Sequence, residues 1–323
     1  MRILAAVGSV VIGVVLAGCG GDGPQDGSQG TPTPPPGTGA PADPGARLQA
    51  STVLVEVAAS GREAVAAQVG VVVSPDGHVV TVGSVIAARG GAPEATVTAG
   101  DGRPRPAEVL GTDPRTSLAV LRVAEADGLV PAVFADAAAL AAGDRVLVVG
   151  GPQDPGGIRD ARVRDPSVVA GAVSTVEVDT AAPGGGVVGT PEGELLGFLV
   201  TSVDTDGVKA AHAVPADLIR RVADQIIAGG PVTHPYLGVA LDAAPDGGAA
   251  VRQVADGSPA ADAGLRPGDV LVRVGGVEID DPDAVVARVQ AASPGERLAV
   301  AYLRDGTEQE VTVTLAALPP GGA

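Results

Sequence analysis

From residue 51 onward, short apolar runs rich in Val, Ala and Leu alternate with breaks that contain Gly, Pro or Asp. Such runs are typical of β-strands, because β-branched side chains pack well on a pleated surface and turn residues end it. Many strands with few helical patterns between them predict an antiparallel sandwich or a pair of barrels. The predicted strands are 51–58, 66–73, 78–82, 94–99, 118–123, 145–149, 168–174, 194–202 and 208–214.

Helical patterns are few. The first predicted helix runs from Pro215 to Ala228, with Pro215 in its first turn and two glycines after its end. In the last third of the chain, Asp281 can cap a second helix. Two final strands, 297–303 and 308–315, flank a turn at 305–306. This change of pattern predicts a second, smaller α+β domain.

Composition and charge exclude several classes of function. The chain has 323 residues, a formal net charge of −17 and one lysine, Lys209. Binding of nucleic acid phosphates needs clustered Lys and Arg side chains, and this composition does not provide them. The same charge disfavours electrostatic docking on anionic lipid. No spacing of Cys, His and Asp suggests a metal site, and no cofactor is expected.

The N-terminus carries an export signal. Arg2 precedes an apolar run from Ile3 to Ala17, which is short for a bilayer span and typical of a signal peptide. The run ends in Leu-Ala-Gly-Cys at Cys19, which resembles the lipobox of bacterial lipoproteins. The resemblance implies cleavage before Cys19 and lipidation of its thiol. The alternative is an ordinary cysteine in a cleaved secretory signal.

Residues 20–47 are rich in Gly and Pro and almost free of apolar side chains, so we expect a disordered linker there. The predicted organisation is a signal peptide with lipobox at 1–19, this linker, a barrel domain at 48–229, a short linker at 230–235, the α+β domain at 236–318 and a tail at 319–323.

Turn glycines and apolar strands recur in one particular order in the barrel segment. Gly70 to Thr81 reads Gly-Val-Val-Val-Ser-Pro-Asp-Gly-His-Val-Val-Thr, Gly111 to Leu121 ends in Ser-Leu-Ala-Val-Leu, and Asp179 to Gly197 contains Ala-Ala-Pro-Gly followed by Gly-Glu-Leu-Leu-Gly. This order resembles the trypsin-like proteases of the HtrA/DegP/DegQ type. The resemblance implies a mostly β fold, a trypsin-like double antiparallel β-barrel.

The resemblance also implies three catalytic positions, and all three are substituted. Ser84 stands where the family has its histidine, Ser117 where it has its aspartate, and Gly186 where it has its serine, with Gly185 an equally good equivalent of the serine. Acyl transfer needs serine, histidine and carboxylate as a unit. Loss of the serine or histidine alone costs about 10⁶ in turnover. We therefore expect a pseudoprotease with no catalytic residue.

The rival interpretation is an active serine endopeptidase of envelope protein quality control that uses a non-standard nucleophile. Its candidate groups each have a simpler structural explanation. His78 is expected to be a solvated residue at a hairpin entry, His212 a strand residue, and His234 part of a linker. Lys209 is expected to be a solvated hairpin charge, and Asp113 a turn residue.

The segment from Tyr236 to Leu318 resembles a PDZ domain of the bacterial HtrA arrangement, through Tyr-Leu-Gly-Val at its start and the run 257–271. The resemblance implies that backbone N–H groups of Leu237, Gly238 and Val239 hold a peptide's terminal carboxylate. The peptide would pair with the strand from Val239 to Leu241. Three residues would line the pocket for its last side chain: Leu237, Val286 and Val289.

These features together predict a lipid-anchored, extracytoplasmic HtrA-like pseudoprotease. Its PDZ domain would bind C-termini or extended segments of envelope proteins, in a scaffold, chaperone-like or regulatory role. A further alternative is a regulatory subunit that joins active HtrA-type paralogues. The family often trimerises through aromatic contacts near the barrel's N-terminus, and this chain has no aromatic residue before Phe134, which argues against a homotrimer.

Overall fold

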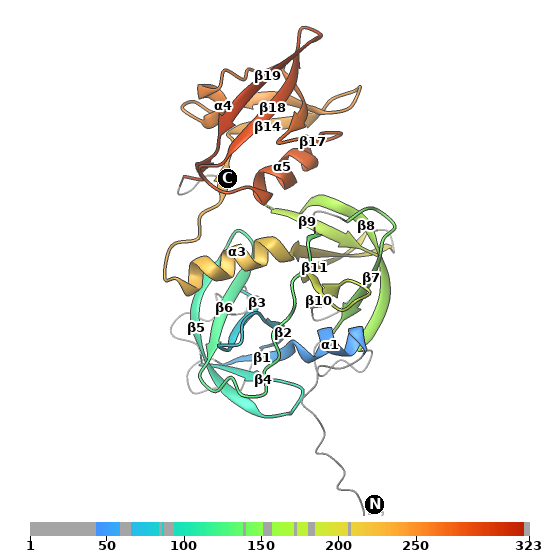
Figure 1. Ribbon diagram of the computed structural model, residues 1–323, viewed down its shortest axis with the longest axis vertical. Coiled ribbons are helices and arrows are strands. Elements are labelled where there is room, and N and C mark those ends of the chain that lie inside the picture. Colours follow the sequence, from blue (N-terminus) through green and yellow to red (C-terminus); the bar gives the residue numbers. More distant parts are fainter. Residues whose placement is uncertain are drawn as a thin grey trace, which may run out of the picture. The chain divides into compact units, whose positions relative to one another are not determined.

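The computed structural model describes residues 43–58, 66–83, 86, 94–137, 140–150, 157–170, 173–179, 185–205 and 208–319 (Figure 1). The predicted signal peptide, Cys19 and most of the predicted linker lie outside these residues. Within the described part of the chain, no helix is long and apolar enough to cross a membrane.

The first barrel closes six antiparallel strands in the order β1-β2-β3-β6-β5-β4. Its core is almost entirely aliphatic, with Val53, Val55, Val79 and Leu121 excluded from solvent. These residues alternate along their strands, so that every second side chain points inward. The strands are β1 Thr52–Ala58, β2 Ala66–Val72, β3 His78–Val82, β4 Glu94–Thr98, β5 Pro104–Asp113 and β6 Leu118–Val123.

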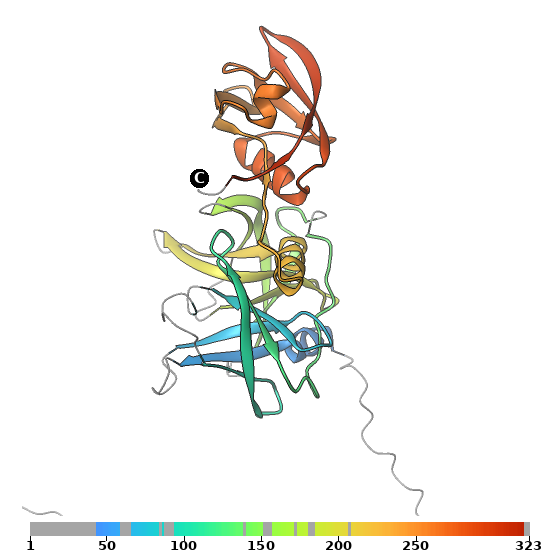
Figure 2. The ribbon, with the colours of Figure 1, turned by 90° about the vertical axis from the view of Figure 1, so that its left-hand side faces the viewer.

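The second barrel closes in the order β10-β11-β12-β9-β8-β7. The hairpin of β11 and β12 projects beyond the other strands (Figure 2). Two closed antiparallel barrels in a mostly β chain confirm the predicted double-barrel fold. The strands are β7 Arg145–Val149, β8 Ile158–Ala170, β9 Val173–Val178, β10 Gly186–Gly189, β11 Leu195–Thr205 and β12 Val208–Pro215.

A shared core joins the two barrels. Phe198, fully buried, packs in one cluster with Leu118 of the first barrel. The helix α3, Ala216–Ile227, adds Ile219 and Val222 to this cluster. Pro215 is its N-cap instead of a first-turn residue, which moves the predicted start by one position. The helix lies against strands of both barrels (Figure 1).

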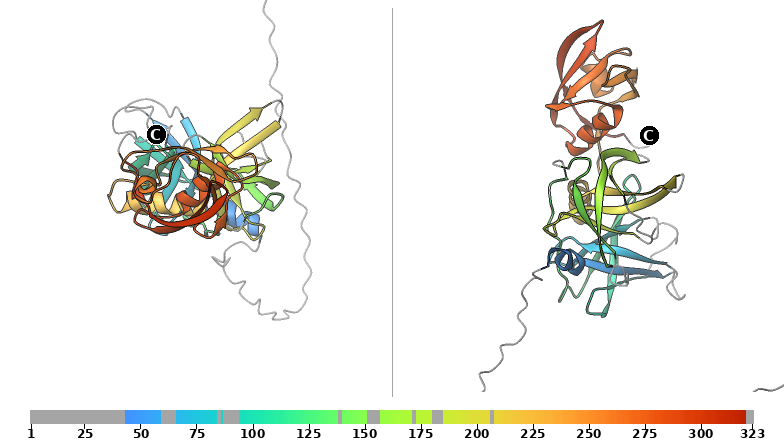
Figure 3. Two further views of the ribbon diagram at one scale, coloured as in Figure 1. Left: turned by 90° about the horizontal axis from the view of Figure 1, so that it is seen from above. Right: turned by 90° about the vertical axis from the view of Figure 1, so that its right-hand side faces the viewer.

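The helix α1, Pro44–Ala50, begins inside the segment whose composition indicates a linker. The carboxylate of Asp43 accepts a hydrogen bond from the Gly45 amide at 2.9 Å, and Pro44 fits the first helical position. Leu48 is 1% exposed and joins the shared core. The helix contacts β1 and β7 (Figure 3). The Asp43 cap and the buried Leu48 therefore stabilise a helix in a segment whose Gly-rich and Pro-rich composition predicts a linker.

Some strands differ from the predictions. The predicted strand 168–174 is wrong as one element, since it covers the end of β8 and the start of β9. The strands β5 and most of β8 were not predicted. Pro104 and Pro106 lie in β5, and in the first part of β8 charged Arg and Asp residues separate Ile158, Ala161 and Val163, so neither has an apolar run.

The C-terminal domain is built on a sheet in the order β14-β15-β16-β18-β19, with β17 paired to β16. The helix α5, Pro282–Ala291, begins as predicted, because the Asp281 carboxylate accepts from the Ala284 amide at 2.8 Å. The remaining elements are β13 Pro235–Tyr236, β14 Val239–Ala243, β15 Ala249–Val254, α4 Pro259–Asp262, β16 Val270–Val274, β17 Val277–Glu278, β18 Arg297–Arg304, β19 Thr307–Thr314 and β20 Ala316–Ala317.

Candidate functional site

The two described positions of the substituted triad carry no group arranged for acyl transfer. Ser84 lies outside the described residues. Ser117 is exposed and adopts φ 57°, a left-handed conformation that is uncommon for serine. Its carbonyl accepts a hydrogen bond from the Gly83 amide at 2.7 Å, which fixes this turn before β6.

Gly186 is the first residue of β10 and is buried. A Cβ at this position would lie 2.7 Å from the carbonyl oxygen of Val149, a backbone atom of the neighbouring strand. A serine could therefore not replace Gly186 without movement of the barrel wall. Gly185 has more room, with the nearest atoms at 3.8 Å, but its φ of 87° strains any residue with a side chain.

His78 is buried, which corrects the expectation of a solvated strand residue. Its Nδ1 lies 2.7 Å from the hydroxyl of Ser74, across the turn that joins β2 and β3. Burial lowers the pKa of His78, the positive charge of Arg122 lowers it further, and Asp76 opposes both effects. The pair is thus a serine hydroxyl beside an imidazole that favours its neutral form.

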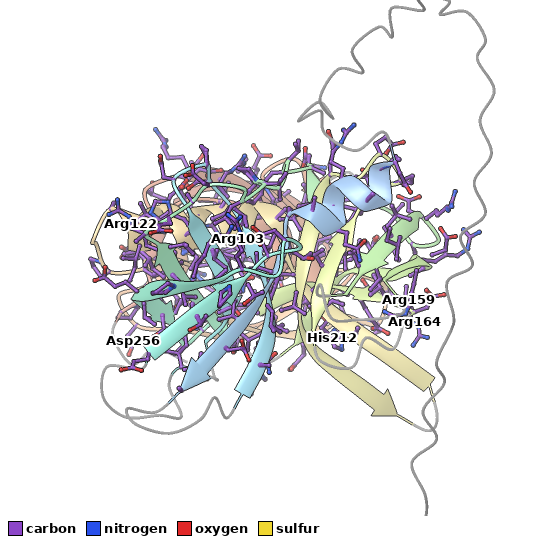
Figure 4. All side chains as sticks on the ribbon, turned by 90° about the horizontal axis from the view of Figure 1, so that it is seen from below. Arg103, Arg122, Arg159, Arg164, His212 and Asp256 are labelled. Atoms are coloured by element: carbon purple, nitrogen blue, oxygen red, sulfur yellow. The ribbon has the colours of Figure 1, made fainter. Side chains whose placement is uncertain are left out.

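The other two histidines also have hydrogen-bonding partners. His212 lies on β12 of the second barrel, with Nδ1 3.3 Å from the hydroxyl of Thr175 (Figure 4). His234 is buried, and its Nε2 lies 3.2 Å from the carboxylate of Asp113. Asp113 thus contacts a residue 121 positions away in the sequence. The prediction that Asp113 is a turn residue did not include this long-range contact. In the described part of the chain, no cluster of three His, Cys, Asp or Glu could hold a metal ion.

The second candidate site is the loop before β14. The carbonyl of Leu237 accepts from the Ala260 amide at 3.0 Å, and the carbonyl of Gly238 accepts from the Ala255 amide at 2.9 Å. Gly238 has φ 88°, and a Cβ there would lie 2.2 Å from the Cβ of Ser258. Only glycine fits this loop, for reasons of both conformation and space.

The strand β14 offers a pairing edge, because it stands at the end of the strand order. Val239 lies opposite Val254, and the hydrogen bond beside this pair runs from the Ala255 amide to Gly238. This pattern marks a non-hydrogen-bonded pair, in which the N–H and C=O groups of each residue point away from the partner strand. The polar groups of Val239 therefore point toward the open edge.

Apolar side chains lie between this edge and α5. Leu237 and Val289 are 5% and 8% exposed and belong to the domain core, whereas Val286 is only half-buried. Leu241 is also half-buried and packs against the same core. The structure thus places all six predicted peptide-binding residues in one loop, one strand and one helix of this domain.

Ser258 was not predicted to serve this site. It is 2% exposed, and its hydroxyl lies between the Gly238 carbonyl and the first turn of α4. The signal that could have identified it is the sequence Gly-Ser-Pro at 257–259, where serine followed by proline indicates a helix start.

Two family models match the chain. The trypsin-like peptidase domain matches residues 68–207, and the PDZ domain matches residues 235–315. The chain is 30% identical over 361 residues to "Serine protease PepD" of Mycobacterium tuberculosis, covering 97% of this chain and 77% of that protein. It is 34% identical over 273 residues to "Probable periplasmic serine endoprotease DegP-like" of Brucella suis, covering 77% of this chain. The chain spans 52% of the length of that relative.

Solved structures give the same fold. The "HtrA-type protease AlgW with tripeptide" matches with a TM-score of 0.64 at 24% identity, over 87% of this chain and 99% of that one. The serine endoprotease from Yersinia pestis matches with a TM-score of 0.56 at 25% identity, over 85% of this chain and 97% of that one. The double barrel and the PDZ domain predicted from the sequence are both confirmed.

Proposed function

We propose that this chain, which belongs to the HtrA-like family of trypsin-like peptidases with a PDZ domain, binds peptides and has no peptidase activity. The PDZ domain would bind the C-termini or extended segments of envelope proteins, with the barrels as a scaffold. Related proteins named periplasmic support an extracytoplasmic location.

The contrast between the two sites carries this proposal. Gly186 has no side chain, and the backbone oxygen of Val149 occupies the space that a serine would need. The loop at Gly238, in contrast, has the positive φ and the hydrogen bonds of its carbonyls to Ala255 and Ala260, which direct the following amides toward the open edge of β14. Peptide binding by a PDZ domain uses backbone N–H groups and needs no catalytic side chain.

Two parts of the proposal rest on the sequence. Cys19 would carry the lipid that anchors the protein to the cell membrane, as the lipobox resemblance implies. Active HtrA-type paralogues are possible partners, in a regulatory role. Globomycin treatment of the producing bacterium, which blocks lipoprotein signal cleavage, would retain the full signal peptide if Cys19 is lipidated, and a Cys19→Ala variant would not respond.

Fluorescence polarisation with a library of labelled peptides tests the main proposal. We expect micromolar binding of peptides with a free C-terminal carboxylate and much weaker binding when that carboxylate is amidated. Gly238→Glu should abolish binding, because its side chain would overlap Ser258. Unchanged affinity of the Gly238→Glu variant would show that peptides bind elsewhere.

A specific contact supports a second candidate function, an active serine endopeptidase with a displaced nucleophile. The Ser74 hydroxyl lies 2.7 Å from His78 Nδ1, so the imidazole could accept its proton. The relatives named serine endoproteases give this candidate its context. Fluorophosphonate labelling followed by peptide mapping would decide it. A phosphonylated Ser74, together with casein cleavage that Ser74→Ala abolishes, would establish the second function and refute the first.

A further inference from the structure

The segment from Ala255 to Ala261 lies directly behind the carboxylate-binding loop. Amides of Ala255 and Ala260 donate to the carbonyls of Gly238 and Leu237, at 2.9 and 3.0 Å. The hydroxyl of Ser258 lies 3.4 Å from the same Gly238 carbonyl. Two successive carbonyls of the loop therefore face one segment, whereas successive carbonyls of an ordinary strand alternate in direction.

The direction of these carbonyls fixes the direction of the amides. In a planar trans peptide unit, the C=O and the following N–H point in opposite directions. The Leu237 carbonyl faces α4, so the N–H of Gly238 faces away from α4. The Gly238 carbonyl faces the same segment, so the N–H of Val239 faces away as well. Successive amides with a shared direction form a concave anion-binding site.

From this arrangement we infer that Ser258 is a positioning residue for the bound carboxylate: its buried hydroxyl fixes the peptide units whose amides receive that group. The inference rests on the proposed peptide-binding function. Ser258 would not touch the ligand, since it lies on the opposite side of the loop.

The hydroxyl of Ser258 makes two contacts at once. It donates toward the Gly238 carbonyl, and it accepts from the Ala261 amide at 3.2 Å as the N-cap of α4. Because the side chain is 2% exposed, water cannot easily replace these contacts. Removal of the hydroxyl would release both the loop carbonyl and the first turn of α4.

Steric contact adds a second restraint. The position of a Cβ on Gly238 lies 2.2 Å from the Cβ of Ser258, so the glycine backbone rests directly on this side chain. Ser258 therefore restrains the loop in two ways from the same side, by a hydrogen bond and by van der Waals contact. This placement requires serine or a residue of nearly the same shape at position 258.

The affinity experiment compares three variants of the whole protein with one free-carboxylate peptide from the library and its amidated form. Ser258→Ala should weaken the free-carboxylate peptide on the order of tenfold, with little change for the amidated form. Ser258→Thr keeps the hydroxyl and should restore most of the affinity. Asp43→Ala removes the N-cap of α1 in the barrel domain, and peptide affinity should be unchanged.

Amide NMR signals of the free protein give a readout that does not depend on any peptide. In Ser258→Ala the Gly238 and Val239 signals should shift and broaden, whereas in Ser258→Thr they should stay near their original positions. Unperturbed signals, or equal weakening of free and amidated peptides, would overturn the positioning role. If the original protein binds no peptide while these signals respond to Ser258→Ala, the proposed function fails and the positioning role stands.

Discussion

Removal of the Asp113 carboxylate should strongly destabilise the protein, because Thr116 and His234 would lose the buried acceptor of three contacts at once. Asp113 is 5% exposed, and its Oδ2 accepts from the hydroxyl of Thr116 at 2.6 Å and from the Thr116 amide at 3.2 Å. His234 Nε2 lies 3.2 Å from the same carboxylate. The carbonyl of His234 in turn accepts from the Leu318 amide at 2.8 Å.

The magnitude follows from what Asp113→Ala would leave behind. A buried donor without an acceptor typically costs about 1–3 kcal/mol, and Asp113→Ala would leave the Thr116 amide, the Thr116 hydroxyl and His234 Nε2 without theirs. Since part of the cost overlaps, we expect a loss of about 3–5 kcal/mol in the free energy of unfolding at pH 7. That is a large share of the roughly 5–15 kcal/mol of an ordinary domain.

The pH dependence supplies an independent check. Burial raises the pKa of Asp113, but hydrogen bonds from His234 and Thr116 outweigh burial and hold the pKa below its usual range. The unfolded chain therefore binds this proton more readily, and the contribution to stability is present above the unfolded pKa near 4. It is lost as pH falls below about 4, through the folded pKa.

Urea denaturation of the original protein, of Asp113→Ala and of Asp113→Asn, across pH 7 to pH 3, measures both effects. The difference in unfolding free energy should be largest at neutral pH and shrink below about pH 4. Asp160→Asn is the matched control, since Asp160 pairs with Arg145 at the surface and should cost less than about 1 kcal/mol. A loss below about 1 kcal/mol for Asp113→Ala, or a constant difference at all pH values, would refute the reasoning.

Three further predictions concern backbone conformation and buried charge. Ser117→Asn should raise the free energy of unfolding by up to about 1 kcal/mol in urea titrations, because asparagine tolerates φ 57° better than serine does. Gly186→Ser should yield no casein cleavage and should lower stability by about 1–3 kcal/mol, because its Cβ would meet the Val149 oxygen. Asp269→Ala should lower the melting temperature of the C-terminal domain, because Asp269 is 1% exposed and Arg304 Nε donates to it at 2.7 Å.

The sequence predicts most of the barrel strands because valine and leucine form separate runs where strands are buried. Residues 118–123 and 145–149 were predicted with their observed bounds. The strand β5 was not predicted, because polar residues and two prolines interrupt its apolar pattern. Pairing with β4 and β6 stabilises it as a strand. Tertiary pairing overrides local propensity there.

The same contrast between local sequence pattern and long-range contact separates the loop at Gly238 from the Asp113–His234 pair. The proposed carboxylate-binding loop is a continuous stretch whose backbone groups would bind the ligand, so a local motif was enough to propose Leu237 to Val239 from the sequence. The Asp113–His234 pair joins residues 121 positions apart, and no local pattern indicates such a contact. Ser258 lies between these cases, since its helix start is readable locally but its contact with Gly238 is not.

Gly186 and Gly238 look alike in the sequence, since each is followed directly by aliphatic residues. The structure separates their roles. Gly238 is required by its positive φ and by its close contact with Ser258, so only glycine maintains the loop conformation proposed to bind a carboxylate. Gly186 has an ordinary strand conformation but faces the backbone of β7, which forbids a side chain. At Gly186 the proposed loss of catalysis is therefore a property of the path of β10 as well as of one missing hydroxyl, and Gly186→Ser alone would not reverse it. At Gly185 the positive φ opposes a side chain instead.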